Sequence, residues 1–373
     1  MTPAAKGERS AWVVSYAHNG RQHLKTFKTK KAAVDWRAEM TVEKGRGIHT
    51  PASTSITVAD AAARWLAQAQ DDELEPSTIA GYEQAVRLHI APFLGTVKLV
   101  DLTAAGIEDF RNRLRREGRS PAMARKITAS LGGIVAHAMS LGLVSRNPVR
   151  EAVQYGKRRA RLSARHTVRL EVGVDIPTKD ELRLILAHAS ARWRPLIVTA
   201  VFTGLRASEL RGLTWKDVDL HNCALRVRQR ADRWDTIGSP KSAGSRREVP
   251  LAPMVVNTLK EWQLACPKGD AGLVFPANDG TVEALHNLSR QGLGKAQQAA
   301  GLCASWRLPK YGMHSLRHAA ASLFIEQGFS PKKVQALMGH SDIGMTFNVY
   351  GHLFPSQDSD AEAMRQLQAR VVG

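Results

Sequence analysis

Residues 314–350 read HSLRHAAASLFIEQGFSPKKVQALMGHSDIGMTFNVY and combine four side chains of notable chemistry. His314 and Arg317 come first, His340 follows, and Tyr350 closes the stretch. These residue types are able to bind an anion, transfer protons and attack an electrophile. The spacing of the apolar residues between them predicts three short helices that bring the four groups together.

Local signals predict where those helices begin and end. The first is expected from Ser315 to Gln327, and the (i, i+3) spacing of His314 and Arg317 at its start places both on one face. Ser330 is expected to cap a second helix that ends at Gly339, so His340 lies just past a helix end. Ser341 is expected to cap the third helix, which carries Tyr350.

Composition favours a polyanionic partner. The chain has 373 residues, enough for two or three domains, and a formal net charge of +19. Nucleic acid is the first candidate for such a surplus, and an anionic membrane surface is the alternative. No apolar run approaches the roughly 18 residues of a spanning helix, so we expect no membrane span and a cytoplasmic protein. Its three cysteines match neither a disulfide framework nor a metal site and are expected to be small buried residues.

Four segments follow in order along the chain. Residues 1–50 predict a small basic domain, with a hairpin turning at Asn19-Gly20 and a helix that packs on it through Ala33 and Trp36. Residues 56–155 predict a bundle of four helices, with caps at Thr57, Ser77 and Thr103. Residues 156–173 are expected to form a basic linker, and residues 174–373 are expected to form the last domain with a tail helix.

Basic residues crowd one part of the predicted bundle. Seven cations lie in its third helix, the next turn and the start of the fourth: Arg111, Arg113, Arg115, Arg116, Arg119, Arg125 and Lys126. A solvated face is the ordinary interpretation, yet such crowding favours contact with phosphates.

The last domain supplies two further candidates upstream of the opening stretch. Thr178 and Glu181 predict a capping box, and a buried helix is expected over residues 196–202. Gly204 then allows a tight turn that places Arg206 in the first turn of the next helix, where its planar fork suits a bound phosphate. Lys241 is expected at a mobile tip between two strands, residues 224–227 and 248–251.

Arg206, Lys241, His314, Arg317, His340 and Tyr350, in this order, resemble the active-site set of the tyrosine recombinases, the family of phage integrases. The resemblance implies a multi-domain, mainly α protein with small β-sheets. Its expected parts are an arm-binding-like domain with a three-stranded sheet plus a helix, a helical core-binding bundle, and an α+β catalytic domain. Expected partners are double-stranded DNA at core-type and arm-type sites, a homotetramer on two duplexes, and a DNA-bending or directionality protein.

The chemistry of the six residues supports the same reaction. Phosphodiester oxygens repel nucleophiles, so catalysis needs positive charge around them, which Arg206, Arg317 and His340 are able to supply. A phenol pKa near 10 means that Tyr350 must lose its proton during attack, and His314 is the candidate base. Lys241 is the candidate acid for the departing 5′-oxygen. We expect no cofactor and no metal.

Several alternatives stay open from the sequence. Tyr311 is the rival nucleophile, and Glu209 is better interpreted as a structural partner of an arginine than as a catalyst. A type IB topoisomerase shares the chemistry, and a non-catalytic DNA-binding protein is a third function class. The amphipathic tail over residues 357–370 is expected to dock either on its own domain or on a neighbouring protomer.

Overall fold

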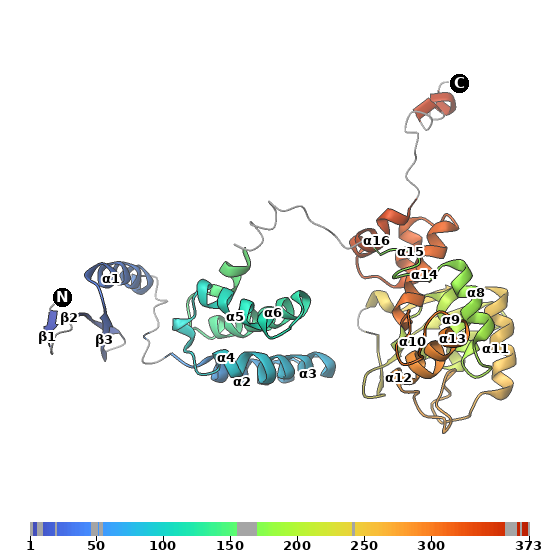
Figure 1. Cartoon of the computed structure of the whole chain (residues 1–373), viewed down its shortest axis with the longest axis horizontal. Helices are drawn as coiled ribbons and strands as arrows, with labels where there is room; N and C mark the ends of the chain where they lie inside the picture. Colours follow the sequence, from blue (N-terminus) through green and yellow to red (C-terminus); the bar gives the residue numbers. More distant parts are fainter. Residues whose placement is uncertain are drawn as a thin grey trace. The chain divides into compact units, whose positions relative to one another are not determined.

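The computed structural model describes residues 3–5, 10–18, 21–45, 51, 55–154, 170–240, 243–354, 364–365 and 368–371. The chain divides into two compact units, Met1–His166 and Thr167–Gly373 (Figure 1). The basic run of the predicted linker, most of the predicted tail helix and Lys241 lie outside the described residues.

The N-terminal residues form a small antiparallel sheet with one helix. Strands β1 (Pro3–Ala5), β2 (Ser10–His18) and β3 (Arg21–Phe27) pair in that order. Helix α1 (Lys30–Gly45) packs on the sheet through buried Ala33 and through Trp36, whose ring centroid lies 5.4 Å from that of Tyr16. The three-stranded sheet and the packing of Ala33 and Trp36 were both expected; the turn residues Asn19 and Gly20 lie outside the described residues.

Residues 58–140 form the expected helical bundle. Its helices are α2 (Val58–Asp71), α3 (Pro76–Ala85), α4 (Ala91–Leu94), α5 (Ala104–Arg116) and α6 (Pro121–Ser140), with a π-helical turn over Val86–Ile90 and a 3-10 turn over Leu99–Asp101. Thr57 and Thr103 cap α2 and α5 as predicted. The prediction that Ser77 caps a helix is wrong. α3 starts at Pro76, because proline suits the first helical position, where no backbone N–H is needed.

Helix α9 lies at the centre of the second unit. Helix α8 (Lys179–His188) begins with the predicted Thr178–Glu181 capping box. α9 (Arg194–Thr203) is almost wholly buried, as its apolar sequence predicted, and packs between α11 (Pro253–Ala265) and α14 (Met313–Glu326). It ends at Gly204, whose φ of +65° is the left-handed conformation that glycine adopts without strain.

A small sheet and a separate hairpin follow α10 (Ala207–Arg211). Strands β4 (Val218–Asp219), β5 (Ala224–Val227) and β8 (Arg247–Pro250) form the sheet, in the order β4-β5-β8. Between β5 and β8, strands β6 (Arg230–Ala231) and β7 (Ile237–Gly238) form a second hairpin that the sequence analysis missed. Lys241 therefore follows β7 in the chain, whereas the β6–β7 turn lies over residues 232–236.

The rest of the unit consists of helices and helical turns joined by irregular segments. It contains α12 (Leu285–Asn287), a π-helical segment over Leu288–Gly294, and α13 (Lys295–Ala299), with 3-10 turns at Trp215–Asp217, Ala243–Ser245 and Gly351–Leu353. The helices expected from the opening stretch are α14, α15 (Pro331–Met338) and α16 (Ile343–Tyr350). Ser330 caps α15, but Asp342, without a side-chain cap bond, replaces the predicted Ser341 at the start of α16.

Two global expectations have different outcomes. No helix among the described residues is long and apolar enough to cross a membrane. The cysteines, expected to be buried, are not: Cys223 is exposed and Cys266 and Cys303 are partly exposed. Cys223 occupies a tight turn before β5 with a φ of +51°, so its turn position outweighs its apolar character.

Candidate active site

The three C-terminal helices bring His314, Arg317, His340 and Tyr350 together, although their sequence positions span 37 residues. His314 and Arg317 lie in the first turns of α14, His340 follows α15, and Tyr350 is the last residue of α16. The rings of His340 and Tyr350 are nearly parallel, with centroids 6.2 Å apart. Tyr350 is 2% exposed and packs among apolar residues of α14 and α15.

Arg206 joins this group from α10, 133 residues before its partner Gly339. The sequence predicted Arg206 in the first turn of this helix. That prediction is wrong, because Arg206 is the N-cap residue of α10. Its guanidinium donates to Glu209 Oε1 at 2.7 Å and to the Gly339 carbonyl oxygen at 3.0 Å. Arg206 thus ties α10 to the turn that positions His340.

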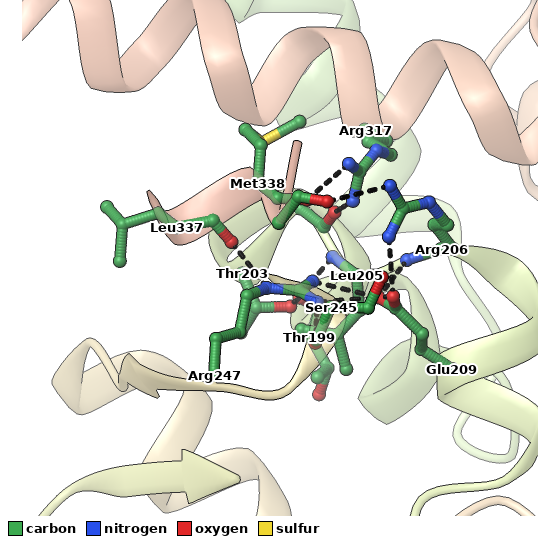
Figure 2. A network of polar contacts seen from close by, with 12 residues as sticks. Thr199, Thr203, Leu205, Arg206, Glu209, Ser245, Arg247, Arg317, Leu337 and Met338 are labelled. Carbon is green, nitrogen blue, oxygen red and sulfur yellow. Dashed lines mark hydrogen bonds and ion pairs between the residues drawn. The ribbon is translucent and has the colours of Figure 1, made fainter. Parts of the chain in front are cut away.

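Glu209 is the buried anion that organises the arginines (Figure 2). Besides Arg206, it accepts hydrogen bonds from Nη1 and Nη2 of Arg247 at 3.1 Å and 2.8 Å. Burial by itself raises the pKa of Glu209, but hydrogen bonding and the charges of Arg247 and Arg206 outweigh it and hold the pKa below its ordinary value. The interpretation of Glu209 as a structural partner of an arginine is confirmed.

Arg247 was missed by the sequence analysis. It starts β8, is nearly buried, and donates from Nε to the Leu337 carbonyl oxygen at 2.7 Å, so that it fastens the sheet to α15. The sequence did hold a signal for a second arginine. Glu209 lies in an apolar segment, and a buried carboxylate there needs more positive charge than the partly exposed Arg206 provides. Nothing local in the sequence identified which arginine supplies it.

Arg317 is more enclosed than Arg206 and Arg247. It is 3% exposed and donates to the carbonyl oxygens of Gly204, at 2.5 Å, and Met338 (Figure 2). Burial and then the charge of Arg206 lower the pKa of Arg317 to about 9, which leaves the guanidinium charged at neutral pH. Two cations close enough for the charge of one to lower the pKa of the other favour a bound anion.

The histidines are neutral. Burial, followed by the charges of Arg317 and Arg206, lowers the pKa of His340 to about 4, and the same three causes lower the pKa of His314. His340 Nδ1 lies 2.9 Å from the Thr346 hydroxyl oxygen, a bond that fixes the ring. At neutral pH each imidazole therefore has one nitrogen able to accept a proton and one able to donate.

The phenol of Tyr350 pairs with a histidine that the sequence analysis did not select. His318 Nδ1 lies 2.6 Å from the Tyr350 hydroxyl oxygen, whereas His314 contacts the edge of the His318 ring, with centroids 4.4 Å apart. Burial raises the pKa of Tyr350 to about 12, against a smaller opposing effect of Arg317. The available signal was the (i, i+4) spacing of His314 and His318, which places both on one helix face.

A pocket of about 500 Å³ opens beside the arginine network. Its lining includes Arg206, Glu209, Ser245, Gly339 and Pro240. Pro240 immediately precedes Lys241, so the chain carrying the predicted acid borders this pocket, although Lys241 itself lies outside the described residues. The described residues hold no group of three or more histidine, cysteine or carboxylate side chains arranged for a metal.

Tyr311, the rival nucleophile, is part of a different cluster. Its side chain is fully buried, and its hydroxyl oxygen lies 2.8 Å from Glu181 Oε2 and 3.0 Å from the Gly173 carbonyl oxygen, the two acceptors that share its one hydrogen. These contacts fasten the start of α8 to the chain before α14. They favour Tyr350 as the nucleophile.

Comparison with known proteins gives the family. The sequence model of the Phage integrase family matches residues 177–357, and that of the phage integrase N-terminal SAM-like domain matches residues 57–115. A tyrosine recombinase XerC-like protein of Caldanaerobacter subterraneus subsp. tengcongensis is 27% identical over 368 residues, covering 92% of this chain and 91% of the relative. The transposase of transposon Tn916 from Enterococcus faecalis is 31% identical over 186 residues, covering 46% of this chain and 44% of the relative.

Solved structures share the fold. The Tn1549 transposon integrase, in complex with a circular intermediate DNA, aligns with a TM-score of 0.68 at 21% identity, covering 84% of this chain and all of that one. A lambda integrase tetramer bound to a Holliday junction aligns with a TM-score of 0.60 at 20% identity, covering 93% of each chain. The fold is that of the DNA integrases. The chain belongs to the tyrosine recombinases, the family of the phage integrases.

Proposed function

We propose that this protein is a site-specific DNA recombinase, an integrase that cleaves and rejoins DNA strands through a 3′-phosphotyrosine and thereby integrates or excises a mobile element. The observation that carries the proposal is the convergence of a buried tyrosine, two arginines and neutral histidines from helices far apart in the sequence. This arrangement matches the needs of phosphodiester chemistry. The family membership of the chain supports the same function.

The positive groups suit a scissile phosphate. Arg206, Arg317 and His340 are assigned to its non-bridging oxygens, where their charge and hydrogen bonds stabilise the added negative charge of the transition state. Because Glu209 and main-chain carbonyls hold the guanidinium groups before DNA binds, little reorganisation is needed during the reaction. The arginines supply the positive charge, so the proposal assigns no role to a metal.

The reaction balances as a transesterification. The Tyr350 oxygen forms a bond to phosphorus as its proton passes to a neutral histidine, and the bond from phosphorus to the 5′-oxygen breaks. Lys241 is assigned as the acid that protonates the departing 5′-oxygen. Attack by the 5′-hydroxyl of a second strand then releases the tyrosine and joins that strand, so no external energy source is required.

Each catalytic centre cuts one strand, so exchange between two duplexes requires four protomers. The solved lambda integrase tetramer on a Holliday junction supports this assembly. We assign core-type DNA to the bundle and catalytic domain, and arm-type DNA to residues 1–50. An accessory DNA-bending or directionality protein and a cytoplasmic location, in a bacterium or phage-infected cell, complete the proposal.

A nicked duplex that bears the recombination core tests the proposal. Cleavage next to the nick releases a short fragment that carries the free 5′-hydroxyl, and this fragment diffuses away. Without it the strand cannot be rejoined, so a covalent protein–DNA adduct should accumulate with the unmodified chain. Tyr350→Phe should bind the duplex as tightly and give no adduct, because it lacks only the attacking oxygen. Tyr311→Phe is the matched control and should still form the adduct.

Two results would overturn parts of this assignment. An adduct that persists in Tyr350→Phe and disappears in Tyr311→Phe would transfer the nucleophile to Tyr311. A protein that binds the duplex but never forms an adduct would be a non-catalytic DNA-binding protein. Incubation with two differently labelled duplexes distinguishes a recombinase from a type IB topoisomerase. A recombinase joins the two duplexes to each other, whereas a type IB topoisomerase reseals each one.

A further inference from the structure

His318 is the only described residue that hydrogen-bonds to the Tyr350 hydroxyl. The distance from His318 Nδ1 to the phenol oxygen is 2.6 Å, and the two rings meet at an angle of 60°. His318 lies on α14 one residue after Arg317, so the helix that supplies a phosphate-binding cation also supplies the partner of the phenol. His314 makes no hydrogen bond to Tyr350 among the described residues and contacts the His318 ring instead.

We propose that His318, and not His314, directly accepts the Tyr350 proton during strand cleavage. The inference rests on the proposed recombinase function and deepens it. As the phenol oxygen bonds to phosphorus, the hydroxyl proton moves to His318 Nδ1. During rejoining, the same proton returns to the phenol oxygen as its bond to phosphorus breaks, so His318 is restored in each cycle.

Transfer of the phenol proton to His318 Nδ1 requires one tautomer of His318. Tyr350 is protonated at neutral pH, since burial raises its pKa, and a hydroxyl donates to a nitrogen that carries no hydrogen. In the tautomer that accepts this hydrogen bond, His318 Nδ1 carries no hydrogen and Nε2 carries the imidazole hydrogen. This tautomer is the one that has to be present before the phenol can give up its proton.

The charges around His318 make its basicity dependent on the substrate. Burial, then the His314 ring when it is protonated, and then the charge of Arg317 lower the pKa of His318 to about 4, while the charge of Asp175 opposes them. The other titratable groups that face it are Tyr350 and His340. A bound phosphodiester would bring a negative charge close to Arg317, which offsets the effect of that arginine and raises the affinity of His318 for a proton. The base thus becomes stronger when DNA occupies the site.

His314 has a supporting place in this scheme. Its ring meets that of His318 at an interplanar angle of 79°, which fixes how His318 is turned toward Tyr350. Removing His314 should therefore loosen the site, whereas removing His318 should delete the proton acceptor itself.

Single-turnover cleavage of the nicked core duplex by the full-length chain, measured from pH 5 to pH 9, tests the inference. We compare His318→Phe, which keeps a ring without a nitrogen, with His318→Asn, whose amide keeps a hydrogen-bonding atom close to the position of Nδ1. His314→Asn is the matched control. Thermal unfolding and duplex binding are measured for every variant, which separates loss of folding from loss of chemistry.

We expect His318→Phe to cleave about 10²-fold more slowly or worse, with duplex binding unchanged, because positioned general bases contribute at least that much. Its rate should rise with pH across the whole range, since hydroxide must then remove the phenol proton. The unmodified chain and His314→Asn should instead reach a plateau. His318→Asn should fold and bind normally and still lack the plateau.

The opposite pattern would overturn the inference. If His318→Asn keeps the plateau and cleaves within about threefold of the unmodified chain, while His314→Asn loses the plateau, His314 is the acceptor. Failure of the proposed function looks different, because then the unmodified chain itself forms no adduct. The two ideas are therefore tested separately by one set of reactions.

Discussion

At the scale of single residues, the site depends on a buried carboxylate. Glu209 is 2% exposed and neutralises part of the charge of Arg206 and Arg247, which in turn reach Gly339 and Leu337 on the opposite side of the site. Removing one partner of a buried ionic network leaves an uncompensated charge, which costs far more than losing a surface ion pair. The positive groups are therefore held in place by an anion that does not itself react.

Substitution of Glu209 should show this dependence. Glu209→Gln keeps the shape and removes the charge, and we expect the free energy of unfolding to fall by about 3–5 kcal/mol. Urea denaturation of the full chain measures it. Glu248→Gln is the control, because the Arg226–Glu248 pair is about half exposed and should contribute about 0–1 kcal/mol. Equal effects of both substitutions would contradict the role given to Glu209.

The acid assigned to Lys241 gives a second test at this scale. Lys241→Ala should slow cleavage far more than it weakens duplex binding, because the departing 5′-oxygen then lacks a proton donor. A substrate with 5′-sulfur in place of that oxygen should restore the rate, since a thiolate leaves without a proton. A 5′-sulfur substrate that stays slow with Lys241→Ala would show that the lysine acts in another way.

At the scale of elements, two glycines allow the helices to approach closely. Gly204 ends α9 and Gly339 ends α15, both in the left-handed conformation. A Cβ on Gly204 would lie 2.8 Å from the sulfur of Met338, and one on Gly339 would lie 2.8 Å from Nη1 of Arg247. The carbonyl group of Gly204 also accepts a hydrogen bond from Arg317, and that of Gly339 accepts one from Arg206. Helix ends, as well as side chains, thus form the site.

Gly339→Ala should therefore reduce cleavage activity by more than its loss of folding stability accounts for. Gly328→Ala is a matched control, because Gly328 is also left-handed, with a φ of +78°, and has open space around its Cα. Both substitutions should destabilise the protein by about 1–2 kcal/mol through backbone strain. Only Gly339→Ala should also displace Arg247 and strongly reduce adduct formation. Similar cleavage rates for the two variants would exclude a role for this close approach.

At the scale of the whole molecule, the chain consists of separately packed parts, to which the proposed function assigns different DNA contacts. The sheet with α1, the helical bundle and the catalytic fold each have their own packing, and the basic cluster of the bundle lies mostly on its exposed surface. Electrostatic contacts from several modules add to the salt dependence of binding, because each neutralised phosphate releases counterions. The net charge of +19 fits such distributed contact.

Deletion of residues 1–50 should separate these roles. The shortened chain should still cleave a nicked core duplex, because the proposed catalytic residues all lie after residue 200. It should lose binding to arm-type DNA, and the salt dependence of binding to a duplex with both kinds of site should become shallower. Gel-shift titrations at several salt concentrations measure both effects. Unchanged arm binding would remove the assignment of this module.

The sequence alone determined much of the fold, because many of its signals are local. The Thr57, Thr178 and Ser330 caps, the buried α9 and the three C-terminal helices all depend on residues within a few positions of each other. Where two local signals competed, prediction failed: Pro76 displaced Ser77 at the start of α3, and the residues between β5 and β8 paired as β6–β7. Short strands carry too few residues for periodicity to reveal them.

Tertiary structure alone decided how the reactive groups in residues 314–350 pair. The sequence placed His314, Arg317, His340 and Tyr350 on neighbouring helices, but the packing of α16 against α14 selects His318 as the partner of Tyr350. Arg206 reaches a carbonyl 133 residues away, and Arg247 reaches one 90 residues away. Such contacts follow from the burial of Glu209 and from the close approach of helix ends, and these depend on the packing of the entire unit.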